Sequence, residues 1–449
     1  MNTRLIERFV AARARTETLA APLSDEDQIL QSMPDCSPTK WHRAHTTWFF
    51  EAFALGSLGD TPDAARALLW NSYYEAVGPR IPRNRRGMMS RPTAAEVGTY
   101  RREIDARLVE RLLALRTDDL ALSRIGPLVE LGIAHEEQHQ ELLLTDILNA
   151  FSMHPFAPSC YPESARERDS GSSGGPAHRP RSSATDYVAF EGGLVWIGAE
   201  AGSAQFSFDN EGPRHRVWLD PFELATRLVT IGDVKAFIAE GGYRTASLWL
   251  SAGWDFVRAE GIEAPLYASF EDGEYRTFGL HGKRTPSDGE PVSHISLYEA
   301  DAIARFLGAR LPSEAEWEHA VAAQDCTGGL RKDGEAWTEG PMLDVGEHGV
   351  ASPLHPQERL AAAPDGLLPL HGNVWQWTRS TYAPYPGYAP AGGAVGEYNG
   401  KFMVNQNVLR GGSCLTPRGH LRPTYRNFWA PQTRFQMSGL RLAREGEKR

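Results

Sequence analysis

The chain has few cysteines and no surplus of basic residues, and both shortages narrow what it can be. Its four cysteines, Cys36, Cys160, Cys326 and Cys414, lie far apart in 449 residues and form no Cys-x-x-Cys pair. A disulfide framework is therefore not expected, and we expect the protein to work in the reducing cytoplasm. The formal net charge of −10 gives no reason to expect a broad nucleic-acid-binding surface.

Long apolar runs are also missing. No run of about 18 apolar residues occurs, so no membrane-spanning helix is expected. The first ten residues carry Arg4, Glu7 and Arg8 among their apolar residues, which argues against a signal peptide. With 41% hydrophobic and 23% charged residues the composition is typical of a globular protein, and the length suffices for two or three domains.

The first 150 residues predict a helical bundle. Apolar residues recur at helical spacing, and Ser37-Pro38 and Pro92-Thr93 are start signals for helices. Four helices within this length make a four-helix bundle the economical architecture. The helices are expected at residues 5–32, with a break near Ala21-Pro22, and at 38–51, 92–115 and 126–151.

Residues 163–186 are polar and rich in Gly, Ser and Pro, which predicts a flexible linker between a domain at 1–162 and another at 187–449. After the linker, short strand-like segments alternate with short helices, and Ser313 with Glu316 forms a capping-box pattern. An α+β domain with sparse secondary structure fits this texture. Strands are expected at 187–197 and 215–224, and helices at 230–239, 297–307 and 313–322.

Two histidines stand out inside the fourth expected helix. His135 and His139 are four residues apart and therefore lie on one helical face. His42 and His45 share nearly one face of the second helix, and packed helices approach within about 10 Å, so ligands from both can converge. Imidazoles with open positions beside them suit Fe(II), Zn(II) or another first-row metal. Ordinary helix-face histidines are the simpler alternative.

The same stretch also matches the zinc-protease pattern His-Glu-x-x-His. In that interpretation Glu136 would be the general base between His135 and His139. The longer continuation with a further Gly and His is absent, and the five-residue pattern alone arises often by chance. The protease interpretation is therefore kept only as an alternative.

Two features of one loop carry both a structural and a functional interpretation. Tyr73 and Tyr74 lie between the two histidine-bearing regions, where a phenol can donate a proton near an open metal site or can simply pack. Several arginines follow in a Pro/Gly-rich stretch, where guanidinium groups can pair with substrate carboxylates or form a solvated positive loop. These arginines are Arg80, Arg83, Arg85, Arg86 and Arg91.

A third candidate lies near the C-terminus, at Asn427, Phe428 and Trp429. Aromatic planes beside an amide can bind a quaternary ammonium group by cation–π attraction. Core packing is the competing explanation.

Taken together, several motifs resemble the ergothioneine-biosynthesis sulfoxide synthases. The resemblance covers about residues 3–445 except the linker. It implies an N-terminal DinB-like four-helix bundle and a C-terminal domain like the formylglycine-generating enzyme, with a C-type-lectin-like fold. The motifs, in order, are Trp-His-Arg-Ala-His-Thr-Thr-Trp-Phe-Phe-Glu, His-Glu-Glu-Gln-His, Leu-Pro-Ser-Glu-Ala-Glu-Trp-Glu, Gly-Asn-Val-Trp-Gln-Trp, Arg-Gly-Gly-Ser and Ser-Gly-Leu-Arg.

The resemblance implies a non-haem Fe(II) enzyme. Such an enzyme uses O2 to join the sulfur of a thiol to C2 of the imidazole of hercynine (Nα-trimethylhistidine), leaving a sulfoxide. The family pattern maps the three iron ligands onto His45, His135 and His139, and leaves His42 to support or packing. The implied partners are small molecules, with no nucleic acid and no membrane.

One string resembles a branch of this family. Asn71 to Gly78 reads Asn-Ser-Tyr-Tyr-Glu-Ala-Val-Gly, as in members that take their catalytic tyrosines from this loop and use cysteine rather than γ-glutamylcysteine. The resemblance makes Tyr73 or Tyr74 the proton donor. It also implies that Arg80 and Arg83 hold the thiol substrate's carboxylate, that Gln138 lies near hercynine, and that Asn427, Phe428 and Trp429 receive its trimethylammonium and carboxylate groups.

The chain departs from the formylglycine-generating enzyme in one respect. The C-terminal domain has only Cys326 and Cys414 and no evident copper motif, so we expect a substrate-shaping scaffold there. Three alternatives stay open: γ-glutamylcysteine as the donor, an ovothiol-type enzyme that joins cysteine to unmethylated histidine, and a non-catalytic ligand-binding protein. Ovothiol-type enzymes usually carry an extra methyltransferase domain, and none is visible.

Overall fold

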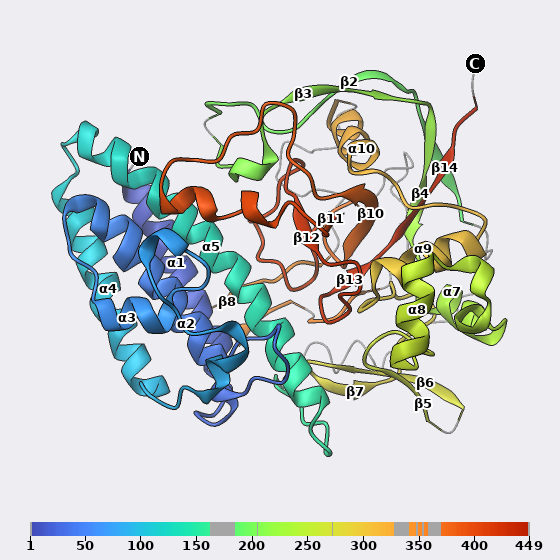
Figure 1. The fold of residues 1–449 in the computed structure, drawn as a ribbon, viewed down its shortest axis with the longest axis horizontal. Helices are drawn as coiled ribbons and strands as arrows, with labels where there is room; N and C mark the ends of the chain where they lie inside the picture. The colour runs from blue at the N-terminus through green and yellow to red at the C-terminus, as the bar shows by residue number, and fades with distance from the viewer. Residues whose placement is uncertain are drawn as a thin grey trace.

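The structure, a computed structural model, has two regions that differ in texture. It describes residues 2–161, 185–203, 205–271, 273–326, 341–346, 349–352, 354–357 and 370–447. A helical N-terminal region packs beside a C-terminal region of small sheets and short helices, which confirms the predicted α+β architecture (Figure 1). The predicted linker lies outside the described residues except Thr185 and Asp186, so the domain boundary stays a prediction.

The N-terminal region is built on four long helices. They are α1 (Asn2–Ala20), α2 (Thr39–Phe49), α4 (Ala94–Ala114) and α5 (Asp119–Ser152), and the short helix α3 (Ala64–Trp70) lies in the connection between α2 and α4. A π-helical turn, Phe50–Leu55, extends α2. The expected start of the last helix at Gly126 is wrong, because the Asp118 carboxylate caps an earlier start by accepting the Ala121 N–H (3.0 Å). Pro127 is accommodated inside α5.

Helix starts differ in how they are capped. Thr93 and Glu96 form a capping box at the start of α4, which places the helix start close to the expected position. The expectation that Ser37 caps α2 and that Pro38 is its first helical residue is wrong, because Pro38 is the N-cap and no side chain caps it. The Ser37 N–H instead donates to Asp146 of α5 (2.7 Å). The start of α2 is therefore tied to the helix that it faces.

Each of the two strands expected in the C-terminal region splits into a pair. Residues 187–197 form β1 (Tyr187–Phe190) and β2 (Gly193–Ile197), which belong to different sheets. Between them Gly192 packs so closely on the Leu219 carbonyl that a Cβ would lie 2.2 Å from that oxygen. Residues 215–228 likewise form β3 (His215–Leu219) and β4 (Phe222–Leu228), broken at Asp220-Pro221.

The sheets of this region are small and mostly antiparallel. The largest has the order β12-β11-β10-β13, and a second has the order β1-β4-β14. Helices α7, α9 and α10 confirm the three short helices expected from sequence, whereas α8 was not expected. The remaining elements are α7 (Ile231–Ala239), α8 (Ser251–Glu260), β5 (Ala268–Glu271), β6 (Glu274–Gly279), β7 (Gly282–Arg284), α9 (Leu297–Phe306), α10 (Glu314–Cys326), β8 (Val345–Gly346), β9 (Gly349–Val350), β10 (Trp375–Thr381), β11 (Asn407–Arg410), β12 (Asn427–Trp429), β13 (Ser438–Gly439) and β14 (Arg441–Glu445).

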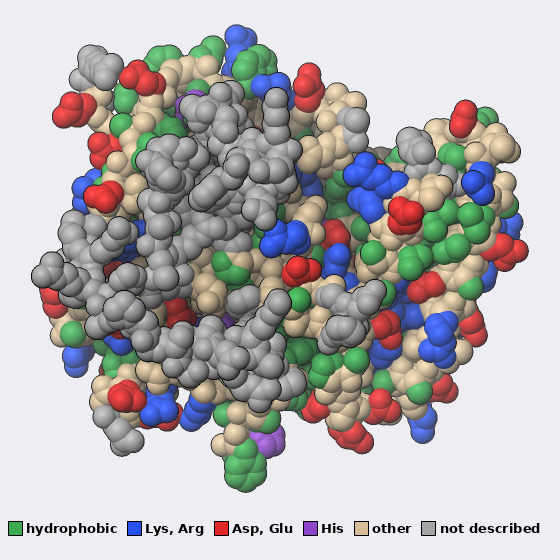
Figure 2. Space-filling model, turned by 180° about the vertical axis from the view of Figure 1, so that it is seen from behind, with side chains coloured by type: hydrophobic (Ala, Val, Ile, Leu, Met, Phe, Trp, Pro, Cys, Tyr) green, Lys and Arg blue, Asp and Glu red, His purple; other side chains and the backbone are tan. Residues whose placement is uncertain are grey.

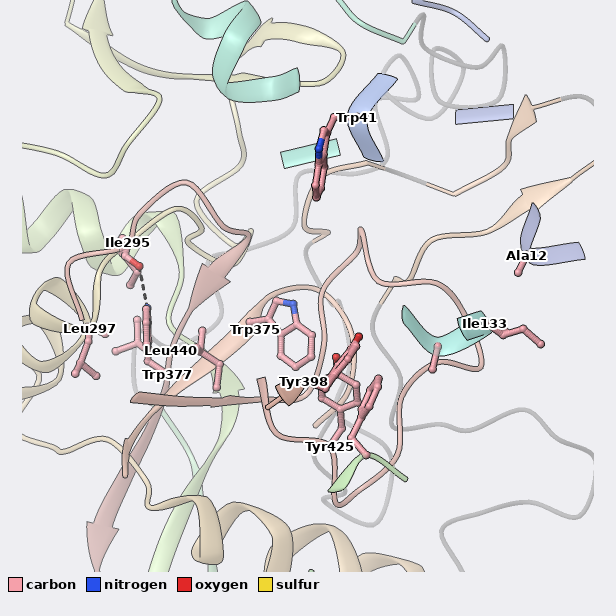
Figure 3. Packing of buried hydrophobic residues seen from close by; sticks show 14 of the residues in the cluster. Ala12, Trp41, Ile133, Ile295, Leu297, Trp375, Trp377, Tyr398, Tyr425 and Leu440 are labelled. Atoms are coloured by element: carbon pink, nitrogen blue, oxygen red, sulfur yellow. Dashed lines mark hydrogen bonds between the residues drawn. The ribbon is translucent and has the colours of Figure 1, made fainter. Parts of the chain in front are cut away.

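The two regions share their apolar core. One cluster of buried residues includes Trp41 and Ile133 of the bundle together with Trp375, Tyr398 and Tyr425 of the C-terminal region (Figure 3). Helix α5 lies between the other bundle helices and the C-terminal region (Figure 1). The helix that carries two of the candidate ligands is therefore held from both sides.

The face of the molecule shown in Figure 2 carries no large area of one charge sign over its coloured part. On the face opposite to Figure 1, acidic and basic side chains are interspersed over the coloured area of the surface (Figure 2). Among the described residues, no helix combines the length and apolarity that crossing a membrane requires.

Candidate metal centre and substrate site

Three histidines meet between α2 and α5. His45 comes from α2, and His135 and His139 come from consecutive turns of α5. One ring nitrogen of each lies within 4.8 Å of the others, and the Nε2 atoms of His45 and His135 are 3.2 Å apart. His45 and His135 are buried, and His139 is partly exposed. The structure thus brings together the three residues that the family pattern selects.

Hydrogen bonds behind the rings indicate which nitrogen of each histidine faces the others. His45 Nδ1 lies 2.6 Å from the Trp70 carbonyl, which can only accept, so Nδ1 carries the proton and Nε2 keeps its lone pair. His139 Nδ1 lies 2.8 Å from His42 Nδ1, which leaves its Nε2 free. His135 Nδ1 is buried without a partner among the described residues. Nε2 is therefore the available nitrogen of His45 and His139, while the Nε2 atom of His135 faces that of His45 at 3.2 Å.

The surroundings keep these imidazoles neutral. Burial lowers the pKa of His135 to about 3. Burial, followed by the neighbouring histidines, also lowers the pKa of His45 and His139 well below the ordinary value. The neutral imidazole is the form that binds a metal ion. The three residues therefore fit a first-row metal.

Glu136 points away from this cluster. Its carboxylate pairs with Arg13 and Arg101, each at 2.8 Å, and accepts from the Thr16 hydroxyl at 2.6 Å. Although burial opposes ionisation, the two guanidinium groups lower the pKa of Glu136 to about 2. A fully buried, ion-paired carboxylate cannot activate water beside the histidines, so the geometry does not support the protease alternative.

The loop with Tyr73 and Tyr74 lies against the C-terminal region. Asn71 closes the loop, because its amide donates to the Tyr74 carbonyl (2.9 Å) and accepts the Tyr74 N–H (3.0 Å). Glu397 accepts the N–H groups of Glu75 and Ala76, each at 2.9 Å. The Tyr74 hydroxyl is buried beside Tyr73, and burial raises its pKa well above the ordinary value.

Tyr398 is a third tyrosine at the site, and no sequence motif singles it out. Its ring centroid lies 5.4 Å from that of His135 and 6.4 Å from that of Tyr73. Its hydroxyl donates to the Gln138 amide oxygen, and the Gln138 amide nitrogen donates to the Tyr425 hydroxyl (2.7 Å). Nothing in the sequence pairs position 398 with position 138, because the contact depends on how the two regions dock. Tyr398 and Tyr425 lie together in Figure 3.

Of the arginines in this loop, only Arg86 has a buried guanidinium group. The resemblance instead implies that Arg80 and Arg83 hold the substrate carboxylate. Arg80 pairs with Glu75 at 2.5 Å, and Arg83 is exposed. Arg86 is buried, stacks 3.5 Å from the Trp41 ring centroid, and donates to the Ser37 and Ser72 hydroxyls. Burial, followed by repulsion from Arg83, lowers the pKa of Arg86 to about 9.

Asn427, Phe428 and Trp429 form strand β12. Phe428 stacks on Tyr382 with ring centroids 3.9 Å apart, and Trp429 packs edge-on against Phe435. Phe402 lies between Phe428 (6.0 Å) and Tyr73 (5.2 Å), which connects this strand to the tyrosine loop. The described contacts thus place β12 behind the tyrosine loop rather than against the three histidines.

Comparisons with known proteins match the helical region and the C-terminal region to two different families. Residues 8–143 match the DinB superfamily, and residues 172–446 match the sulfatase-modifying factor enzyme 1-like domain. The hercynine oxygenase of Mycolicibacterium smegmatis is 30% identical over 446 residues, which cover 98% of each chain. That of Mycobacterium tuberculosis is 31% identical, covering 96% of this chain and 97% of its own. The formylglycine-generating enzyme of Streptomyces coelicolor is 31% identical, covering 54% of this chain and 82% of its own.

Proposed function

The chain belongs to the hercynine oxygenase family of O2-dependent oxidoreductases, and from this premise we propose that it makes hercynylcysteine sulfoxide for ergothioneine biosynthesis. The thiol sulfur of cysteine bonds to C2 of the hercynine imidazole, and O2 supplies the sulfoxide oxygen. The thiol hydrogen and the C2 hydrogen leave with the second oxygen atom as water. The observation that carries the proposal is the convergence of His45, His135 and His139 within 4.8 Å.

Fe(II) is the proposed cofactor, held by these three imidazoles. The donor set fits, because one ring nitrogen of each histidine faces the others within 4.8 Å, the rings are neutral, and nitrogen ligands that leave positions open suit Fe(II). When bound, the iron would supply activation of O2. The chain itself fixes two of the ring orientations through the Trp70 carbonyl and His42.

Arg86 is the residue that we propose to bind the cysteine carboxylate. Its guanidinium is buried and makes no ion pair with a described carboxylate, only bonds to two serine hydroxyls. An anionic substrate group would compensate this charge, since guanidinium binds carboxylates with two parallel hydrogen bonds. Arg80 and Arg83, on the same loop, remain further candidates for this role.

Hercynine is proposed to lie beside Gln138. This side chain is on α5 between the two helical ligands and is fixed by Tyr398 and Tyr425. Aromatic rings attract a trimethylammonium group by cation–π interaction. The family resemblance assigns that end of the substrate and its carboxylate to Asn427, Phe428 and Trp429, and we keep this assignment as a proposal. Their strand reaches the tyrosine loop through Phe402 and does not contact the histidines directly.

Tyr74 or its neighbour Tyr73 is proposed to donate the proton that turnover requires. Burial raises the pKa of both phenols, so both stay protonated at neutral pH. The Tyr74 hydroxyl is buried next to that of Tyr73, which leaves either phenol able to act on a bound substrate. This loop, Asn71 to Gly78, also supports placing the chain in the cysteine-using branch.

Two other substrate pairs are the nearest competitors, namely γ-glutamylcysteine with hercynine and cysteine with histidine. We propose the cytoplasm as the compartment, because Cys36, Cys160 and Cys414 are buried free thiols. The non-catalytic alternative is disfavoured by membership in an enzyme family.

One experiment tests the proposal as a whole. Protein purified without air is loaded with Fe(II), and O2 uptake is measured with each of the three substrate pairs. The proposal predicts one bound iron per chain and the fastest uptake with hercynine plus cysteine. Faster uptake with either other pair would reassign the substrate, and stoichiometric zinc with no O2 uptake would overturn the proposal.

A further inference from the structure

His139, one of the candidate ligands, is the end of a chain of hydrogen bonds that runs through His42 to Asp146. His42 Nδ1 lies 2.8 Å from His139 Nδ1, and His42 Nε2 lies 3.0 Å from Asp146 Oδ2. His42 and Asp146 are both buried. Asp146 is itself held in place by the Ser37 N–H at 2.7 Å. The chain of hydrogen bonds therefore runs from the start of α2 through α5 to His42, and ends on His139.

The chemistry of these groups sets the direction of each bond. An ionised carboxylate can only accept, so His42 Nε2 must carry a proton. In the neutral imidazole the other nitrogen, Nδ1, then has a lone pair and accepts from His139 Nδ1–H. His139 consequently keeps its own lone pair on Nε2, the nitrogen that faces the histidine cluster.

Asp146 matters because two facing imidazoles alone have no fixed direction. Either ring could donate, and if His42 donated, the proton of His139 would sit on Nε2 and block that nitrogen from a metal ion. The carboxylate removes this ambiguity. The other two ligands differ, since His45 uses the Trp70 carbonyl and the Nδ1 atom of His135 has no partner among the described residues.

We propose that His42 and Asp146 are positioning residues that hold His139 in its metal-binding tautomer and ring orientation, and that His42 is not itself a ligand. This inference rests on the proposed function, because it concerns the metal of that site. Outer partners of metal-bound histidines are worth about 10- to 100-fold in metal affinity. Trp41, packed edge-on against His42 with ring centroids 5.7 Å apart, limits how far the His42 ring can rotate.

The test measures Co(II) binding to the full-length, metal-free protein, by competition with a chromophoric chelator and by the visible spectrum of the bound ion. His42→Phe keeps a ring but removes the acceptor, and is expected to weaken Co(II) binding about 10- to 100-fold and to shift the spectrum. His42→Asn places an amide oxygen where Nδ1 was, and is expected to recover most of the affinity. His371→Phe is the matched control, a histidine from the C-terminal region whose ring packs on Trp317.

The outcomes separate cleanly. A Co(II) affinity and a spectrum equal to wild type in His42→Phe would overturn the inference. So would a His42→Asn variant that binds Co(II) as weakly as His42→Phe, because the loss of ring volume would then explain the weaker binding. Should His42→Phe fail to fold by circular dichroism, His42→Leu against His42→Asn decides in the same way. Wild-type protein that binds no Co(II) or Fe(II) would sink the proposed function as well. Wild-type protein that binds metal but yields no sulfoxide would sink only the proposed function.

Discussion

The ring of Tyr398 lies edge-on to that of His135, with centroids 5.4 Å apart, although the two residues belong to different regions of the chain. The Tyr398 hydroxyl also donates to Gln138, in the next turn of the same helix. The C-terminal region therefore supplies one wall of the histidine site.

Tyr398 and Tyr74 are expected to fail in different ways when mutated. Tyr398→Phe removes the donor that fixes Gln138, and should raise the KM for hercynine about 3- to 10-fold, the cost of one neutral hydrogen bond, while the product stays the sulfoxide. Tyr74→Phe, and Tyr73→Phe if that phenol is the donor, should instead divert turnover toward simple thiol oxidation. Steady-state kinetics with product analysis checks both, and Tyr388→Phe, whose hydroxyl donates to Asp209, is the control. Unchanged product ratios in both loop variants would remove the proton-donor role.

Arg86 is expected to set the affinity for the thiol substrate. Arg86→Met removes a charge-assisted contact worth about 1.5–3 kcal/mol, so the KM for cysteine should rise about 10- to 100-fold with a smaller change for hercynine. The exposed Arg83→Met, on the same loop, tests the competing candidate and should change the KM for cysteine much less. If Arg83→Met raised the KM and Arg86→Met did not, the carboxylate site would belong to the outer arginines.

Glu141 is expected to hold the two regions together next to the site. Its buried carboxylate accepts from Trp375 (2.8 Å), Ser413 (2.6 Å) and Thr416 (2.8 Å). Glu141→Ala leaves these buried donors unsatisfied, which should lower the free energy of unfolding by about 3 kcal/mol, measured by urea denaturation. The exposed Glu110→Ala on α4 should cost almost nothing. A stability equal to wild type would show that solvent replaces these bonds.

The ion pairs of Glu136 are expected to make the stability of the protein depend on pH in the acid range. Its pKa is about 2 in the folded protein against an ordinary value of 4.5, so its stabilising contribution is complete above about pH 4.5 and is lost as the pH falls toward 2. The stability difference between wild type and Glu136→Gln, both metal-free, should therefore narrow by about 2 kcal/mol from pH 5 to pH 3. A difference that stays constant over this range would mean that the ion pairs with Arg13 and Arg101 are not formed in solution.

Local features could be predicted from sequence, and long-range contacts could not. The capping boxes at Thr93 and Ser313 depend on residues three apart, and the motif around His135 points to its helix directly. The contacts of Tyr398 with Gln138, and of Trp375 with Glu141, join positions more than 200 residues apart and follow only from docking.

The burial of individual side chains is a further property that the sequence does not show. Arg80, Arg83 and Arg86 look alike in sequence, and only the fold shows that Arg86 alone is covered and stacked on Trp41. The start of α5 at Asp119 differs from the expected start near Gly126, and the helix continues through Pro127.

The most direct test of the central claim is the fate of ¹⁸O2. Fe(II)-loaded protein is incubated with hercynine and cysteine under ¹⁸O2, and the mass of the product is measured by mass spectrometry. The controls are His45→Ala, His135→Ala and His139→Ala. We predict a hercynylcysteine sulfoxide that carries one ¹⁸O, formed by the wild type and by none of the three variants. No coupled product, or a sulfoxide without the label, would contradict the account.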